Sequence, residues 1–495
     1  MMNKATFNNS WKYLLLLLLT CIPIFLFLNA FTIRLWDESR LAINACEMYH
    51  TGNLLIPTFN GAPDMWNTKP PLMIWLQVFS MKLFGINEMA VRLPSALAAL
   101  FTCIIIMSFS VRYIKNFWFG FIWVLVLVTS SGYIEIHAVR TGDYDALLTF
   151  FLTLGSFSFF VFLENLKPKY LYLFFVSMAF AVLTKSAAAL MILPGLFIYA
   201  IIKKKFLFFL KNKHFYIGLS VFLIGAGGYY FMREIYNPGY LQAVMENEFG
   251  SRFLDTIEGH KRSFWFYFEN LFSYTFIIWV FFVPCGIIVG RKHKDKKIKD
   301  LTLFASIMAL IYFLVISSAQ TKLSWYVVPM YPFLALLVGI FIFFVFSRLK
   351  EKKLKHKVLP YIFLIAILIV PYSIIIVKIY QQQKLTYKTE VNGINYYLRD
   401  LLRGNVQNDN FTIVYDGVFT HGKFYLNLLL KQGKNIALKS PGDEIKTGEV
   451  ILISQNEVRK FLEGKYELKI LEELHITGMY QIVREKDINI KQTER

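Results

Sequence analysis

Residues 34–40 read Arg34-Leu-Trp-Asp37-Glu38-Ser-Arg40, and they follow the first long apolar run of the chain without a break. Two carboxylates and two guanidiniums therefore stand at the mouth of a predicted membrane span. Ionisable groups are costly at the edge of a bilayer, so such a group of charges indicates a functional site. Polar, proline-containing sequence continues to about residue 94, which predicts a loop of some 60 residues on one face of a membrane protein.

The composition of the chain is that of a polytopic α-helical membrane protein. Of its 495 residues, 56% are hydrophobic and only 17% are charged, far from the usual balance of soluble domains. The charges collect between apolar runs of about 20 residues, the length that crosses roughly 30 Å of hydrocarbon. We predict about 11 to 13 transmembrane helices. The eleven clearest runs are residues 13–33, 90–111, 117–134, 145–163, 170–184, 186–202, 214–232, 264–289, 301–318, 325–346 and 358–379.

The net charge of +20 could suggest a nucleic-acid partner, so its location matters. Residues 381–495 hold 17 basic and 15 acidic side chains, against 53 and 33 in the whole chain, so the excess lies in the membrane part. Its strongest clusters, at 203–213, 291–299 and 348–357, all fall on one side if the N-terminus is cytoplasmic, as the positive-inside rule requires. We therefore expect a multi-pass plasma (inner) membrane protein that contacts membrane lipids and no nucleic acid.

The loop of residues 34–90 has apolar residues at helical spacing over 39–51 and 70–84. We interpret both stretches as interfacial helices on the outer surface of the bilayer. Lys69 directly precedes Pro70-Pro71, which suits a helix first turn, and the helix N-terminus adds its own positive potential there. Lys69 therefore predicts an anion site, although a lysine that extends to the lipid headgroups is an alternative interpretation.

Other charged residues are expected on the same outer face. Asp145 opens the fourth span, where it either serves the site or only compensates the helix dipole. Lys185 lies in a short outer turn. Lys322 precedes an aromatic pair that includes Tyr326, and a simple role as an interfacial anchor would also explain this tyrosine. Arg252, in the outer loop 233–262, is a second candidate for binding phosphate, because a guanidinium can hold two phosphate oxygens at once.

The composition changes from about residue 384 onward. Helical patterns at 394–403 and 421–431, with strand patterns at 411–415, 450–454 and 479–483, predict a small soluble α/β domain. We therefore divide the chain into a transmembrane domain, residues 1–383, and an extracytoplasmic domain, residues 384–495.

An ordered set of short motifs resembles the GT-C glycosyltransferases that use a lipid-linked sugar. The resemblance is to the branch with the lipid A aminoarabinose transferases and the relatives of the protein O-mannosyltransferases, and it covers roughly residues 12–380. The matching motifs are Asp37-Glu38, Lys69-Pro70-Pro71, Val91-Arg-Leu-Pro94, Asp145 with Leu148-Thr-Phe-Phe151, Leu183-Thr-Lys185, Glu248 with Arg252-Phe253, and residues 322–329.

The resemblance implies a GT-C fold and an inverting transferase that takes its sugar from a polyprenyl phosphate at the extracytoplasmic surface. It implies that Asp37 is a general base or orients the acceptor, with Glu38 beside it, and that Asp145 is a second acidic residue near the reaction centre. Lys69 and Arg252 match positions that hold the lipid phosphate. We add Tyr326, Lys322 and Lys185 to the phosphate site, and Arg40 and Glu248 to the residues that position donor or acceptor.

Two positions depart from the aminoarabinose transferases. Those enzymes typically have Glu just before the lysine and His just after the loop glutamate, where this chain has Thr68 and Phe249. We therefore expect no metal site and no cofactor there, and the change points away from aminoarabinose as the sugar.

The sequence leaves lipid A, another envelope glycan or lipid, and a protein open as acceptors. A transporter of lipid-linked glycan is the rival from another class. It is disfavoured because the charges lie at the outer interface and no halves repeat.

Overall fold

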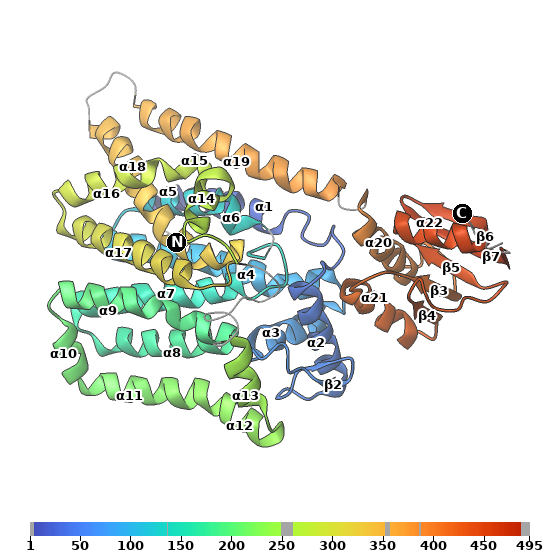
Figure 1. Cartoon of the computed structure of the whole chain (residues 1–495). Helices are drawn as coiled ribbons and strands as arrows, with labels where there is room; N and C mark the ends of the chain where they lie inside the picture. Colours follow the sequence, from blue (N-terminus) through green and yellow to red (C-terminus); the bar gives the residue numbers. More distant parts are fainter. Residues whose placement is uncertain (1–3, 136, 249–260, 352–356, 386–387, 487–495) are drawn as a thin grey trace, which may run out of the picture. The chain divides into compact units, whose positions relative to one another are not determined.

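The structure is a computed structural model that describes residues 4–135, 137–248, 261–351, 357–385 and 388–486. The chain forms two compact units (Figure 1). The first comprises Met1–Leu28 and Asn44–Lys378, and the second comprises Asn29–Ile43 and Ile379–Arg495. Helix α2 (Asp37–Thr51) begins in the second unit and continues into the first, and α19 (Leu359–Leu385) passes from the first into the second.

The described residues of the first unit are mostly helical, and they include a short hairpin of β1 (Thr58–Phe59) and β2 (Ala62–Pro63). Besides α2 and α19 it contains α1 (Lys4–Phe25), α3 (Leu72–Phe84), α4 (Glu88–Phe109), α5 (Phe117–Val128), α6 (Ser131–Ile134), α7 (Asp145–Asn165), α8 (Pro168–Lys185), α9 (Leu193–Ile202), α10 (Phe206–Lys211), α11 (Lys213–Phe222), α12 (Gly228–Tyr236), α13 (Tyr240–Val244), α14 (Phe266–Asn270), α15 (Ile277–Val280), α16 (Phe282–Lys292), α17 (Lys296–Ser318) and α18 (Tyr331–Glu351).

The described residues include seven helical stretches long and apolar enough to cross a membrane, or eight if the bent pair Phe266–Thr275 and Ile277–Lys292 forms one span. The predicted runs 13–33 and 117–134 correspond to shorter apolar helices, Ser10–Phe25 and Phe117–Val128. The helices predicted over 39–51 and 70–84 are α2 and α3. The prediction of a polytopic helical membrane protein is therefore confirmed.

The predicted runs 170–184 and 186–202 both lie in one helical stretch, Pro168–Ile202, of 35 residues. At about 1.5 Å per residue it is longer than one crossing of the hydrocarbon requires. It is broken where α8 ends, because Ser186 has a φ of +47° and a 3-10 segment, Ser186–Ile192, leads into α9. This break places Lys185 at the last turn of α8.

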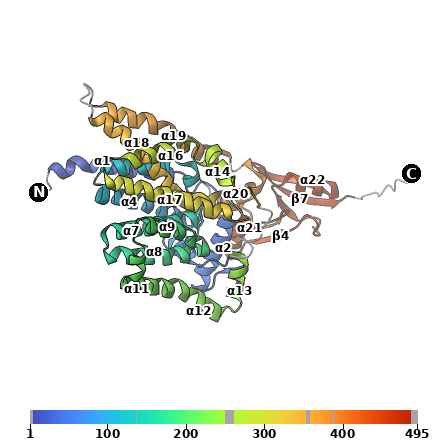
Figure 2. The same cartoon turned by 60° about the vertical axis from the view of Figure 1, so that its left-hand side comes forward.

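The centre of the first unit is formed by α7 and α18, whose apolar stretches are mostly buried. Helix α7 packs against α4 and α8, and α18 packs against α5, α16 and α17; α7, α8 and α17 run alongside one another in both views (Figures 1 and 2). The contact between α16 and α18 requires a glycine at 286, because a Cβ there would lie 1.8 Å from the backbone oxygen of Leu337.

The second unit is a five-stranded sheet in the order β4-β3-β5-β7-β6 with three helices. Its elements are α20 (Glu390–Leu402), β3 (Asn410–Val414), α21 (Thr420–Lys431), β4 (Asn435–Lys439), β5 (Val450–Ile453), α22 (Asn456–Lys465), β6 (Tyr466–Leu474) and β7 (Thr477–Glu485). Strand β3 pairs in parallel with β4 and β5, whereas β7 pairs antiparallel with β5 and β6. The predicted α/β class is confirmed, and β4, β6 and α22 were not predicted.

Candidate functional site

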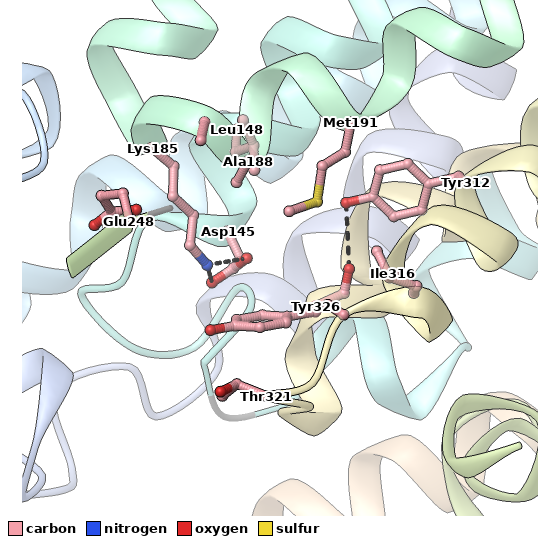
Figure 3. Close-up of a pocket in the computed structure, with 12 residues that line it drawn as sticks. Asp145, Leu148, Lys185, Ala188, Met191, Glu248, Tyr312, Ile316, Thr321 and Tyr326 are labelled. Carbon is pink, nitrogen blue, oxygen red and sulfur yellow. Dashed lines mark hydrogen bonds and ion pairs between the residues drawn. The ribbon is translucent and has the colours of Figure 1, made fainter. Parts of the chain in front are cut away.

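A buried ion pair joins two packed helices of the first unit. Lys185 Nζ lies 2.6 and 2.7 Å from the two carboxylate oxygens of Asp145, and both side chains are almost fully buried (Figure 3). Asp145 begins α7 and Lys185 ends α8, so each charge lies at the helix end whose dipole stabilises it. Helix polarity and pairing together offset part of the cost of burying these two groups.

Asp145 and Lys185 line a small pocket that is partly open to solvent. Glu248 and Tyr326 also face this pocket, and Tyr326 places its ring 5.2 Å from Lys185 Nζ (Figure 3). The Tyr312 hydroxyl donates a hydrogen bond to the backbone oxygen of Tyr326 at 3.3 Å, which fixes the start of the helical segment after Lys322. The remaining lining residues are Leu148, Ala187, Ala188, Met191, Ile316, Ala319 and Thr321. The pocket is thus apolar, with charge concentrated at one side.

A second buried lysine–carboxylate pair reaches the same pocket. Lys69 Nζ lies 3.4 Å from Glu248 Oε1, and both side chains are buried. Lys69 also approaches the ring of Tyr144, the residue before Asp145, at 5.5 Å. Because Glu248 lines the pocket and Tyr144 adjoins Asp145, the two ion pairs form one charged cluster.

A polar network that the sequence analysis missed holds the segment before Lys69. The buried Asp64 side chain accepts hydrogen bonds from Asn44 Nδ2 (3.1 Å) and from the backbone N–H of Asn67 (2.9 Å). Asn67 in turn accepts a hydrogen bond from the Tyr144 hydroxyl at 3.0 Å. Arg233, also buried, donates to the backbone oxygen of Asp64. These contacts connect the backbone near Lys69 with the start of α7.

His137 is another residue for which the sequence analysis proposed no role. Its ring stacks on Trp325 at 3.8 Å, and its Nδ1 lies 3.3 Å from a carboxylate oxygen of the buried Asp143. The same carboxylate oxygen accepts a hydrogen bond from Thr141. These contacts join the loop before α7 to the segment that carries Tyr326. Histidines in loops carry no periodic pattern that would have marked this contact.

Lys322 lies between two spans, close to the pocket. It donates a hydrogen bond to the backbone oxygen of Ala319, and burial lowers the pKa of its ammonium group below the ordinary value. Ala319 and Thr321 line the pocket. Lys322 therefore belongs to the surroundings of the charged cluster.

Asp37, Glu38 and Arg40 lie in the second unit, in the first turn of α2. Glu38 is buried and accepts a hydrogen bond from the backbone N–H of Arg34 at 2.9 Å, whereas Asp37 is exposed. Trp36 has a φ of +76°, a strained backbone conformation for a residue with a side chain, and its carbonyl accepts a hydrogen bond from Ser39 Oγ. The turn thus has a defined shape that presents Asp37.

The predicted phosphate-binding residue Arg252 and the departure at Phe249 lie outside the described residues. Thr68 is buried, and its backbone oxygen accepts a hydrogen bond from the Tyr240 hydroxyl at 2.6 Å. Lys69, Asp145, Lys185, Glu248 and Tyr326 lie near one another in the first unit.

The chain is similar to known proteins over much of its length. Residues 68–227 match the family model described as dolichyl-phosphate-mannose-protein mannosyltransferase. An uncharacterized protein of Aquifex aeolicus is 26% identical over 72% of this chain and 68% of its own length. The undecaprenyl phosphate-alpha-4-amino-4-deoxy-L-arabinose arabinosyl transferase of Shewanella sediminis is 27% identical over 62% of this chain, and the match spans 55% of that transferase.

A solved structure shares the fold over nearly the whole chain. ArnT from Cupriavidus metallidurans, crystallised with undecaprenyl phosphate, superimposes with a TM-score of 0.70 at 15% identity, covering 95% of this chain and 98% of ArnT. At this level of identity the likeness concerns the fold. It extends through both units, so the soluble domain is part of the shared architecture.

Proposed function

We propose that this chain is a membrane glycosyltransferase of the GT-C fold, and that it transfers a sugar from a polyprenyl-phosphate carrier to an acceptor. Its similarity to the aminoarabinose and protein mannosyl transferases supports this proposal. The reaction takes place on the extracytoplasmic face of the plasma membrane, with the N-terminus in the cytoplasm. The acceptor is lipid A or another envelope glycan or lipid.

In this mechanism the acceptor hydroxyl attacks the anomeric carbon of the sugar, and Asp37 takes the hydroxyl proton. The bond from the anomeric carbon to the phosphate oxygen breaks, and its electron pair leaves on the polyprenyl phosphate. A single displacement inverts the configuration of the sugar. Lys69 and Arg252 stabilise the leaving phosphate, and Asp145 serves as the second carboxylate near the reaction centre.

The observation that supports this proposal is the convergence of two buried lysine–carboxylate pairs on one pocket. Lys69 and Lys185 are held in place before any substrate arrives, by Glu248 and Asp145 respectively. Fixed positive charge in a poorly hydrated site stabilises a departing anion more strongly than charge in water, because no reorganisation is needed during the reaction. A lipid phosphate is an anion that a site at the membrane surface would meet.

We propose that the reaction needs no metal ion at the Lys69–Glu248 pair. The residue before Lys69 is Thr68, which offers a hydroxyl in place of a carboxylate and is a poor ligand for a divalent cation. Transfer should then proceed unchanged after exhaustive treatment with a chelator, and restoration of lost activity by Zn²⁺ or Mn²⁺ would contradict the proposal.

A protein acceptor is the second candidate, supported by the match of residues 68–227 to the protein mannosyltransferase model. The two candidates differ in the acceptor alone, so one experiment separates them. Lipids, surface glycans and tryptic glycopeptides are analysed by mass spectrometry in a strain that lacks the protein and in the same strain complemented with wild type or Asp37→Asn.

Loss of one sugar mass from a lipid or glycan, with accumulation of a polyprenyl-phosphate sugar, is the expected result, restored by wild type and not by Asp37→Asn. Loss from glycopeptides alone would identify a protein acceptor. Equal restoration by Asp37→Asn, at equal protein abundance in the membrane, would remove Asp37 from the mechanism.

A further inference from the structure

The segment that carries Asp37 is held by side chains of the C-terminal domain, the part of the second unit from about residue 384 onward. Residues 31–34, just before α2, form no regular secondary structure, and their backbone groups need partners outside a helix or sheet. Within the second unit, the Ile33 N–H donates to the Tyr425 hydroxyl oxygen at 2.8 Å. The Ile33 carbonyl accepts from Asn395 Nδ2 at 3.4 Å. Both polar groups of Ile33 are thus bound by residues more than 350 positions away in the chain.

Two further contacts flank Ile33 on either side. Arg399 Nη1 donates to the backbone oxygen of Ala30 at 3.0 Å, and Ser39 Oγ donates to Thr420 Oγ1 at 2.9 Å. Asn395 and Arg399 lie one turn apart on α20, whereas Thr420 and Tyr425 lie on α21. Two helices of the domain therefore hold the segment from residue 30 to residue 39, which includes Asp37.

The burial of these partners indicates that the segment from residue 30 to residue 39 is held in one specific position. Ile33, Ser39 and Asn395 are completely buried, and Tyr425 is 1% exposed. A buried backbone group that loses its only partner is costly, so these hydrogen bonds specify one position of the segment and disfavour others. Asp37 lies between the anchored residues Ile33 and Ser39 and directly follows the turn at Trp36. Its backbone position is therefore set by these contacts.

We propose that the C-terminal domain positions Asp37 for the reaction, through Tyr425, Asn395, Arg399 and Thr420. These are positioning residues, because they act on Asp37 through the backbone of its segment. The inference rests on the proposed role of Asp37 as base. It assigns the domain a part in the chemistry itself, because a carboxylate displaced by about 1 Å can cost about a hundredfold in rate.

Tyr425→Phe is the direct test, since it keeps the ring and removes the hydroxyl that Ile33 N–H needs. Tyr397→Phe is the matched control, because Tyr397 is equally buried in the same domain and its hydroxyl contacts Asn408 and Glu472. Both variants are made in the full chain, purified in detergent and compared with wild type by hydrogen exchange over residues 29–43. Initial rates are measured with a polyprenyl-phosphate sugar pool extracted from the strain that lacks the protein.

We expect Tyr425→Phe to increase hydrogen exchange over 29–43 and to lower kcat about tenfold or more, with KM for the lipid donor changed less than about twofold. Tyr397→Phe should change neither measure. Faster hydrogen exchange over residues 29–43 with unchanged kcat would show that the position of this segment does not matter for catalysis. Unchanged hydrogen exchange would show that Tyr425 does not hold the segment. Either result overturns the proposal.

Failure of the proposed function is distinguishable from these outcomes. If wild type transfers no sugar from any polyprenyl phosphate, the role of Asp37 as base fails and this proposal fails with it, whatever the exchange data show. If wild type is active and Asp37→Asn inactive, while Tyr425→Phe is fully active, only the positioning role fails.

Discussion

Replacing Lys185 by methionine should leave the Asp145 carboxylate buried without its partner. Methionine has nearly the length of lysine, so the change removes charge and largely preserves volume. The ammonium lies 2.6 Å from the carboxylate, and at an effective dielectric constant near 20 the lost attraction is about 6 kcal/mol. Part of this is offset, because the lysine no longer loses its hydration. We expect a net loss of about 3 to 5 kcal/mol of folding free energy.

Asp145→Asn in the Lys185→Met background should recover much of this loss, since the uncompensated charge is then gone. The double-mutant cycle, measured by unfolding in a graded series of denaturing detergent, should give a coupling free energy of about 2 kcal/mol or more. Lys169→Met, on the same helix but exposed, is the control and should change stability by less than about 0.5 kcal/mol.

A Lys185→Met protein as stable as wild type would refute this reasoning. It would mean that the carboxylate is hydrated through the pocket or finds another cation, and the description of a dry, pre-organised charge cluster would be wrong. Sugar transfer should fall in the same variant even where the protein stays folded, because Asp145 then lacks the group that orients it.

Two further predictions concern other parts of the chain. Lys69→Gln should raise KM for the lipid donor by about tenfold or more. Glu248→Gln should raise this KM less or lower it, because Glu248 competes with the phosphate for Lys69. Initial rates measured against donor concentration test both variants, and a larger increase of KM in Glu248→Gln would contradict the prediction. In the C-terminal domain, burial lowers the pKa of His421 to about 4, although its hydrogen bond to the Val391 carbonyl opposes the shift. The unfolded histidine takes up its proton near pH 6.5, so this contribution to stability, up to about 3 kcal/mol, is present above pH 6.5 and is lost as the pH falls toward 4. Hydrogen exchange over α21 should rise in that window, and an equally steep rise in His421→Asn would exclude His421 as the cause.

The helices of the first unit could be predicted because burial in lipid or protein requires long apolar runs. For this reason helix α7 matches the predicted run 145–163 closely, and the predicted run 325–346 lies within the helical stretch Ser324–Glu351, which contains α18. Strand β6 was missed because six of its nine residues are exposed, so it lacks the alternation that marks a half-buried strand. The short edge strand β4 has one buried residue among five and left no pattern either.

The charged residues of the site could be predicted individually, whereas their pairing could not. Asp145 and Lys69 were recognisable because a charge beside an apolar run is costly and needs a reason. Which charge pairs with which depends on the packing between α7 and α8. It also depends on the helical segment after α13, which brings Glu248 to Lys69, 179 positions earlier in the chain. No local pattern contains that information.

The contact between Ile33 and the Tyr425 hydroxyl shows most directly where local reasoning ends. A tyrosine on the buried face of α21 is explained by its apolar ring alone, and an isoleucine after an apolar run is explained by continuation of that run. Neither residue type indicates that a hydroxyl 392 positions away binds a backbone N–H four residues before Asp37. If the proposed positioning role holds, the residues that control the acidic group closest to the chemistry belong to a domain whose own sequence suggests only a soluble fold.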